Sequence, residues 1–217
     1  MGSAVENLAE LFNKFPGIGP RQAKRFVYFL LSQNDSFTRE LINSINQVKQ
    51  ETKRCVDCFR LSTATTDNLC RLCGDTRRDN SKLMVVAKDI DLENIERSGF
   101  YDGKYFVLGG LLPILEKNPE EKIRLRELTK RAEVLTKNQP DLPAGKAGAG
   151  QPSAEIIIAL SANTEGDYTS DHLTSYLSNL SKDRNIKISL LGRGLSTGTE
   201  LEYSDSDTII NALKNRQ

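Results

Sequence analysis

The chain has 217 residues, of which 30 are Lys or Arg and 29 are Asp or Glu, giving a formal net charge of +1. This balance excludes a globally basic protein, so any surface for nucleic acid must be local. The sequence holds no apolar run of about 18 residues and no basic-then-apolar leader, so we expect no membrane span and a cytoplasmic location. An apolar fraction of 38% suits several small modules better than one large core.

The N-terminal part is predicted to be helical. Residues 4–13 and 21–32 have the apolar spacing of two helices, and FPGIGP at residues 15–20 joins them. Proline and glycine disfavour a helix interior, so this segment predicts a sharp turn. The sequence Asn-Asp-Ser at 34–36 supplies N-cap chemistry for a third helix over about 37–52.

The second of these helices is predicted to carry a basic face. Arg21, Lys24 and Arg25 are spaced i, i+3 and i+4, so they share one side of the helix. The opposite side is predicted to hold the apolar set Phe26, Phe29 and Leu30.

The turn before this helix is predicted to bind phosphate. Gly17 and Gly19 let the backbone turn and expose its N–H groups, and Pro20 suits the first helical turn. Free N–H groups and the helix dipole together favour an anion. The pattern is typical of a helix-hairpin-helix that grips a nucleic-acid backbone without reading bases. A helix–helix turn with a solvated basic face is the alternative, and the glycine-proline turn favours the nucleic-acid interpretation.

The four cysteines are predicted to hold a structural metal ion. They form two C-x-x-C pairs, Cys55 with Cys58 and Cys70 with Cys73. Two such pairs complete a tetrahedron of sulfur ligands, and because all four positions are filled, no site is left for catalysis. Zinc is favoured over iron, one ion per chain, with a rubredoxin-like iron as the alternative.

The rest of the chain is predicted to form an α/β sheet. Apolar, β-branched runs predict strands at 81–87, 105–112, 155–160 and 186–192. Helices are predicted at 91–99, 123–135 and 167–182, and this alternation favours a mostly parallel sheet. Residues 138–153, rich in Pro, Gly and Ala, predict a flexible linker, and the closing segment at 194–216 is predicted to end in a short helix.

Several blocks resemble the RecR family of bacterial recombination mediator proteins. They are FPGIGPRQAKRFVYFLL, the paired cysteines, IERSG, YDGKYFVLGG, ALSANTEGDYTSDHLTSYL and TGTELEYSD, in this order along nearly the whole chain. The resemblance implies a helix-hairpin-helix region at 1–53, a four-cysteine zinc finger at 54–78 and a Rossmann-like Toprim domain at 79–191, with 138–153 as an insertion. The C-terminal segment at 192–217 would be an oligomer contact.

The resemblance also implies a role and partners. The family forms ring-shaped tetramers that can encircle DNA, works with RecO (and RecF), and helps to load RecA on single-stranded DNA. This chain departs from the family where Ala87 replaces a usual Glu, Ser196 a usual Pro and Thr199 a usual Gly. Its cysteine pairs are also spaced a few residues wider.

The Toprim resemblance raises the alternative of a Mg²⁺-dependent phosphoryl-transfer enzyme. Such enzymes need an early glutamate as general acid or base and a later acidic pair for the metal. Ala87 cannot transfer a proton, so no catalytic residue is predicted. The remaining acidic residues, Asp91, Glu165 and Asp167, would instead contact RecO, tune DNA access or belong to a solvated loop. A third alternative, a zinc-ribbon interaction module without DNA contact, leaves the basic face unexplained.

Overall fold

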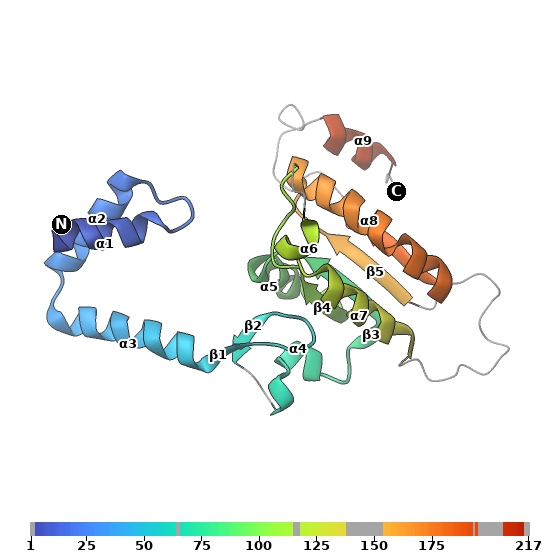
Figure 1. Ribbon diagram of the computed structural model, residues 1–217, viewed down its shortest axis with the longest axis horizontal. Coiled ribbons are helices and arrows are strands. Elements are labelled where there is room, and N and C mark those ends of the chain that lie inside the picture. Colours follow the sequence, from blue (N-terminus) through green and yellow to red (C-terminus); the bar gives the residue numbers. More distant parts are fainter. Residues whose placement is uncertain are drawn as a thin grey trace. The chain divides into compact units, whose positions relative to one another are not determined.

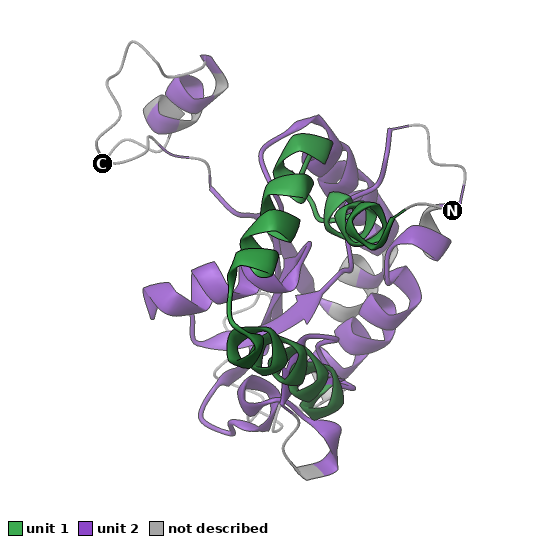
Figure 2. Ribbon diagram, turned by 90° about the vertical axis from the view of Figure 1, so that its left-hand side faces the viewer, with its two compact units in different colours: residues 1–52 green, residues 53–217 purple. Residues whose placement is uncertain are grey.

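The chain divides into two compact units. The computed structural model describes residues 3–63, 66–114, 118–137, 154–192, 194 and 206–214 (Figure 1). The units comprise residues 1–52 and 53–217 and are coloured separately in Figure 2. Within the described ranges, no helix combines the length and the apolarity that crossing a membrane requires. The linker predicted at 138–153 and positions 196 and 199 lie outside the described residues.

The first unit contains the three predicted helices, α1 (Ala4–Asn13), α2 (Pro20–Ser32) and α3 (Asp35–Glu51). Ser3 and Glu6 form a capping box at the start of α1, and the side chain of Asn34 accepts the N–H of Phe37 at 2.9 Å. Helices α1 and α2 pack together through Phe12 and Phe26, whose ring centroids lie 5.7 Å apart. Side-chain capping therefore accounts for the starts of α1 and α3.

The first unit leaves much of its apolar surface exposed. Only Ala9, Ala23 and Val27 are buried among its described residues, and α3 has no buried residue. Its exposed large apolar side chains are Leu11, Phe15, Tyr28, Phe29, Leu31, Phe37, Ile42, Ile45 and Val48. A surface of this kind is typical of a protein–protein interface.

The second unit begins with a small module that carries the cysteines. Its elements are β1 (Thr52–Arg54), β2 (Leu61–Thr63), the 3-10 helix η1 (Thr66–Asn68) and α4 (Arg71–Gly74). Strands β1 and β2 pair into a two-stranded sheet.

A four-stranded parallel sheet follows, which confirms the predicted sheet type. Its order is β4-β3-β5-β6, formed by β3 (Asp79–Val86), β4 (Gly103–Val107), β5 (Ala154–Ala159) and β6 (Ile186–Leu190). The helices are α5 (Asp89–Ser98), α6 (Pro119–Lys122), α7 (Leu125–Lys137), α8 (Thr164–Arg184) and α9 (Ser206–Lys214).

The strand predicted at 105–112 is shorter in the structure. It ends at Val107, because the chain turns at Gly109, where φ is 103°. The N–H groups of Leu108 and Gly109 still donate to the carbonyls of Val86 and Ala87, at 2.8 and 2.9 Å. The backbone ladder therefore continues for two residues beyond the strand.

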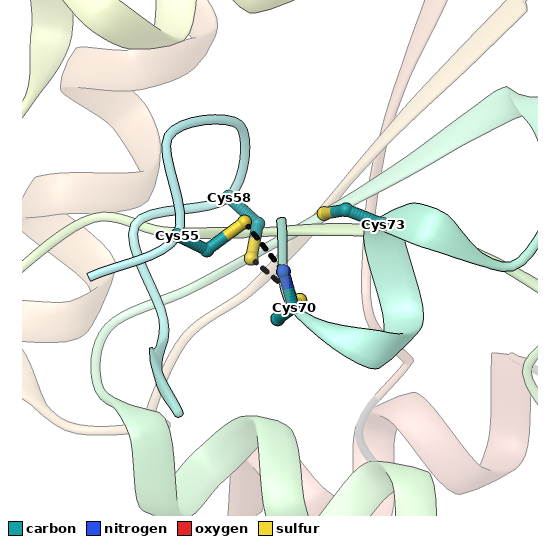
Figure 3. Close-up of side chains that lie close together, drawn as sticks. All are labelled: Cys55, Cys58, Cys70 and Cys73. Atoms are coloured by element: carbon teal, nitrogen blue, oxygen red, sulfur yellow. Dashed lines mark hydrogen bonds between the residues drawn. The ribbon is translucent and has the colours of Figure 1, made fainter. Parts of the chain in front are cut away.

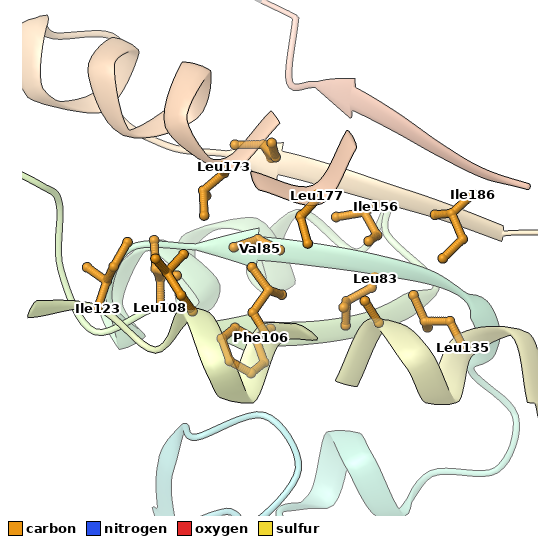
Figure 4. Close-up of a cluster of buried hydrophobic side chains, with 14 of the residues drawn as sticks. Leu83, Val85, Phe106, Leu108, Ile123, Leu135, Ile156, Leu173, Leu177 and Ile186 are labelled. Atoms are coloured by element: carbon orange, nitrogen blue, oxygen red, sulfur yellow. The ribbon is translucent and has the colours of Figure 1, made fainter. Parts of the chain in front are cut away.

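The sheet has a separate core on each face. On one face, Leu173 and Leu177 of α8 and Leu135 of α7 meet strand residues such as Val85 and Phe106 (Figure 4). The other core contains Met84, Val86, Tyr105 and Val107 from the strands and Leu92 from α5, together with the cysteines Cys55, Cys58 and Cys70. The cysteine module thus covers part of one face of the sheet, where a helix would cover it in most α/β proteins.

Candidate metal centre and nucleic-acid interface

The structure brings the four cysteines together. Their Sγ atoms all lie within 4.8 Å of one another, and no other group of at least three Cys, His, Asp or Glu among the described residues could hold a metal ion. Cys55 and Cys58 come from the loop after β1, whereas Cys70 precedes α4 and Cys73 lies within it (Figure 3). The N–H of Cys70 donates to Sγ of Cys55 at 3.3 Å. The two pairs therefore face each other across one small site.

The site suits a tetrahedral metal ion. Zn–S bonds of about 2.3 Å place ligand sulfurs about 3.8 Å apart, close to the 3.5 Å between Sγ of Cys58 and Cys70. The neighbouring thiols, that of Cys58 foremost, lower the pKa of Cys55, whereas sharing the site with Cys55 and the other thiols raises the pKa of Cys73. A bound dication would displace the protons of these four thiols and stabilise them as thiolates. The donor set therefore fits one thiolate-bound ion.

Backbone and side-chain contacts hold the first cysteine pair against the rest of the second unit. The N–H of Val107 donates to the carbonyl of Cys58 at 2.8 Å, and Phe59 packs edge-on against Phe106, with centroids 5.5 Å apart. Asp57, between the two cysteines, lies 3.7 Å from the guanidinium of Arg131 on α7. The pair is therefore held from both β4 and α7.

Further contacts fix the chain around the first pair. The N–H of Leu61 donates to the carboxylate of Asp89 at 2.7 Å, and Arg60 lies 3.3 Å from the carboxylate of Glu93. Both acidic residues belong to α5. The sequence does not predict these contacts, because the residues that form them lie about 30 positions apart along the chain.

The predicted basic face is present on α2. Arg21, Lys24 and Arg25 are exposed, and within the described part of the chain none of them forms an ion pair with a carboxylate. Arg25 donates to the side chain of Gln22 at 3.3 Å, which leaves its charge unneutralised. The opposite side of α2 packs against α1. The three exposed cations thus lie on α2, and Lys24 also lines a groove with Glu6 and Glu10 of α1.

Of the two glycines in the turn before α2, only Gly17 has the backbone conformation that favours glycine. Gly17 has a φ of 75°, which favours glycine, whereas Gly19 is extended, with a φ of −88°. Gly19 is the N-cap, no side chain caps the helix, and a Cβ at Gly19 would meet open space. Pro20 is the first residue of α2, as predicted. The N-terminus of α2 is therefore open to approach by an anion.

The predicted apolar face of α2 needs one correction. Phe29 is 53% exposed, whereas Ala23 and Val27, which the sequence interpretation left out, are each 1% exposed. The buried side is centred on these small and branched residues because they allow α1 to approach closely. Phe26 and Leu30 are half-buried beside them.

The acidic residues do not gather into a metal site. Asp91 accepts the N–H of Lys88 at 2.9 Å and so caps its own helix α5, while Glu165 and Asp167 lie in the first turn of α8. Acidic side chains are favoured at both positions by the helix dipole. Ala87, at the end of β3, is 2% exposed and offers no ligand.

A groove of about 860 Å³ lies at the carboxyl ends of β5 and β6. Its polar lining includes Asp167, Ser170 and Asp171 of α8, and its apolar lining includes Ile158 and Leu191. Ligands of parallel α/β sheets commonly bind at this edge. Of the acidic residues that the sequence singles out, Asp167 is the one that lines the groove.

The fold and the site together define a modular α/β protein with a helical unit, a four-cysteine centre and a parallel sheet. Family models described as "RecR, helix-hairpin-helix", "Toprim domain" and "RecR, C-terminal" match residues 5–49, 81–191 and 194–217. Relatives named "Recombination protein RecR" are 32% identical in Bdellovibrio bacteriovorus and 34% identical in Dehalococcoides mccartyi. Each match covers 99% of this chain, and 97% and 94% of the relatives. The chain belongs to the RecR family of recombination proteins.

Proposed function

We propose that the protein is a recombination mediator that acts as a non-enzymatic, sequence-independent DNA clamp in the bacterial cytoplasm. It would work with RecO (and RecF) in recombinational repair and help to load RecA on single-stranded DNA. The observation that carries the proposal is that Arg21, Lys24 and Arg25, beside the open N-terminus of α2, are exposed and form no ion pair among the described residues. Such a surface contacts phosphates and carries no sequence information. Membership of the RecR family supports the assignment to recombination.

The clamp would be a homo-oligomer, which we propose to be a tetrameric ring. Three cations in one chain bind DNA weakly, whereas several linked copies raise the effective concentration of each contact. The exposed apolar side chains of α3, including Ile42, Ile45 and Val48, support this proposal because they would be covered by another chain. The segment at 192–217 is proposed as a second contact.

The metal is proposed to be zinc, one ion per chain, bound by Cys55, Cys58, Cys70 and Cys73. Four sulfur ligands, of which that of Cys73 is half-buried and the other three are buried, leave no open position, so its role is structural. The proposed limits of the modules are 1–53 for DNA binding, 54–78 for the zinc finger, 79–191 for the Toprim domain and 192–217 for the C-terminal segment.

A phosphoryl-transfer enzyme is the competing function. It is disfavoured by Ala87, which supplies neither a ligand nor a proton, and by Asp91, which caps α5. We propose that Asp91, Glu165 and Asp167 serve partner contact or DNA access. Incubation with supercoiled DNA and Mg²⁺ should leave the DNA intact. Turnover that disappears in Asp167→Ala would favour the enzyme.

DNA binding by the full chain tests the proposed clamp. Fluorescence anisotropy with labelled single-stranded and duplex oligonucleotides of two unrelated sequences should give similar affinities for both sequences. Replacing Arg21, Lys24 and Arg25 with Ala should abolish most of this binding. The matched control replaces three exposed cations of the second unit, Arg71, Lys88 and Arg97, with Ala and should retain DNA binding.

Light scattering tests the proposed oligomer. It should report the mass of four 24.2 kDa chains for the wild type, the basic-face variant and the control variant. A monomeric wild-type protein that does not bind DNA would contradict the proposal.

A further inference from the structure

Lys104 is a buried lysine whose ammonium forms hydrogen bonds only with the second half of the cysteine module. It is 3% exposed and is the one buried charged side chain among the described residues. Its ammonium donates to the backbone carbonyls of Leu72, Cys73 and Asp75, at 3.2, 3.0 and 2.7 Å. A lysine has three N–H donors, so these three acceptors satisfy it fully.

The three carbonyls belong to the segment that presents Cys70 and Cys73. They lie within and just after α4, whose closing carbonyls have no partner inside the helix. A cation at the carbonyl end of a helical turn is favourable both as a donor and as a charge. Lys104 therefore fixes the turn that aims the second pair of sulfurs.

The first pair is held by the same strand. Val107 lies three residues after Lys104 on β4 and donates its N–H to the carbonyl of Cys58. One short strand therefore contacts both cysteine pairs, at positions about 10 Å apart along its length. Strand β4 therefore helps to set the distance between the two cysteine pairs, and with it the size of the site.

Charge gives a second reason for a lysine here. Four thiolates around a dication carry a net charge of −2, and the cysteines Cys55, Cys58 and Cys70 are buried. Burying an ammonium or an anionic cluster alone is costly, and burying the two together offsets that cost. An apolar side chain at position 104 would fill the space but would leave both the carbonyls and the cluster uncompensated.

We propose that Lys104 is a positioning residue of the metal centre, which orients the second cysteine pair and offsets the charge of the loaded site. The inference rests on the proposed zinc. Partners just outside the ligand shell typically change metal affinity by about 10- to 100-fold, so Lys104→Met should weaken zinc binding by that factor. Lys104→Arg should restore most of the affinity, because it keeps the positive charge and the donors. Competition between the full chain and a chelating indicator for zinc measures the zinc affinity of both variants.

Lys82→Met is the matched control. Lys82 lies on the neighbouring strand β3 and pairs with Asp79 and Asp102, at 3.0 Å each. The Lys82→Met substitution removes a lysine from the same sheet and should leave the zinc affinity unchanged. Lys104→Gln, which keeps an amide donor without charge, serves if the Met variant does not fold, and it should bind zinc more weakly than Lys104→Arg.

The visible spectrum of the cobalt-substituted protein reports ligand geometry independently of overall stability. Lys104→Met or Lys104→Gln should shift the cobalt bands, whereas Lys82→Met should not. Wild-type zinc affinity and an unshifted cobalt spectrum in the uncharged variants would overturn the inference while leaving the proposed zinc intact. A wild-type chain that takes up no zinc would overturn the proposed cofactor, and this inference with it.

Discussion

The backbone N–H of Val107 donates a 2.8 Å hydrogen bond to the carbonyl oxygen of Cys58. Strand β4 is an edge of the four-stranded sheet, where unpaired N–H groups invite pairing with other chains. Phe59 packs against the core on one face of the sheet, and the cysteines pack into the core on the other. The cysteine module therefore wraps around this edge, and the metal centre and the sheet should depend on each other.

Removal of the metal should destabilise the sheet as well as the module. Structural zinc contributes about 10–16 kcal/mol in small zinc modules, and here the cysteines share a core with Met84, Val86 and Tyr105. Chelation should release about one zinc per chain and lower the thermal midpoint of the second unit. Metal analysis with calorimetry measures both effects. A protein purified gently without any metal would contradict this prediction.

Leu173→Ala should destabilise the second unit by about 2–5 kcal/mol. Leu173 is fully buried between α8 and the sheet, so the substitution leaves a cavity. Ile90→Ala is the control, since Ile90 is 56% exposed, and it should change stability by about 0.5 kcal/mol or less. Denaturant unfolding of the zinc-loaded chain measures both. If the two substitutions changed the free energy of unfolding equally, Leu173 would not be part of the core.

Gly166→Ala should displace the start of α8. A Cβ at Gly166 would overlap the carbonyl oxygen of Ser161, a backbone atom that cannot move alone. We expect a loss of about 1–3 kcal/mol, as for other overpacked sites. Gly110→Ala is the matched control because its Cβ would meet open space, and it should be nearly neutral. Thermal unfolding compares the pair, and an unaffected Gly166→Ala would show that this turn is not tightly packed.

Glu155 should make the stability of the β5–β6 pair depend on pH. Lys187, at 2.9 Å, and then the hydroxyl of Ser189 hold the pKa of the Glu155 carboxyl below its ordinary value. Because the folded-state pKa is depressed, this stabilisation is present above the unfolded pKa of about 4.3 and is lost as the pH falls through the folded value.

Glu155→Gln should therefore lower the thermal midpoint at pH 7 by about 1–3 °C, as expected for a partly exposed pair. The difference from the wild type should shrink as the pH falls below about 4.3 and through the folded-state pKa of Glu155. Glu40→Gln, at an exposed position in the first unit, should show no such trend. A difference for Glu155→Gln that stays constant with pH would exclude the ion pair as its cause.

The sequence predicts those parts of the molecule whose cause is local. The C-x-x-C spacing brings two sulfurs together within one turn, and the capping residue Asn34 fixes the start of α3 in its own neighbourhood. The alternation of β-branched runs with helices was enough to predict a parallel sheet. These features require no knowledge of distant residues.

The features that the sequence did not predict depend on contacts between distant segments. Lys104 reads as a polar residue before an apolar strand, and only the approach of α4 makes it buried. Phe29 has the spacing of a core residue, but α1 covers Val27 instead. His172, the lone histidine of the sequence, is half-buried beside Tyr176 through packing that its sequence position does not indicate. Burial of this kind is set by tertiary packing and leaves no periodic signal.

The salt dependence of DNA binding tests the proposed clamp most directly. The logarithm of the affinity should fall steeply and linearly with the logarithm of salt concentration, by about 0.9 per duplex phosphate contacted. Replacing Arg21, Lys24 and Arg25 with Ala should lower this slope by about 3 for each hairpin engaged, as well as the affinity. An unchanged slope and affinity in this variant would contradict the account, because the basic face of α2 would then be a solvated surface only.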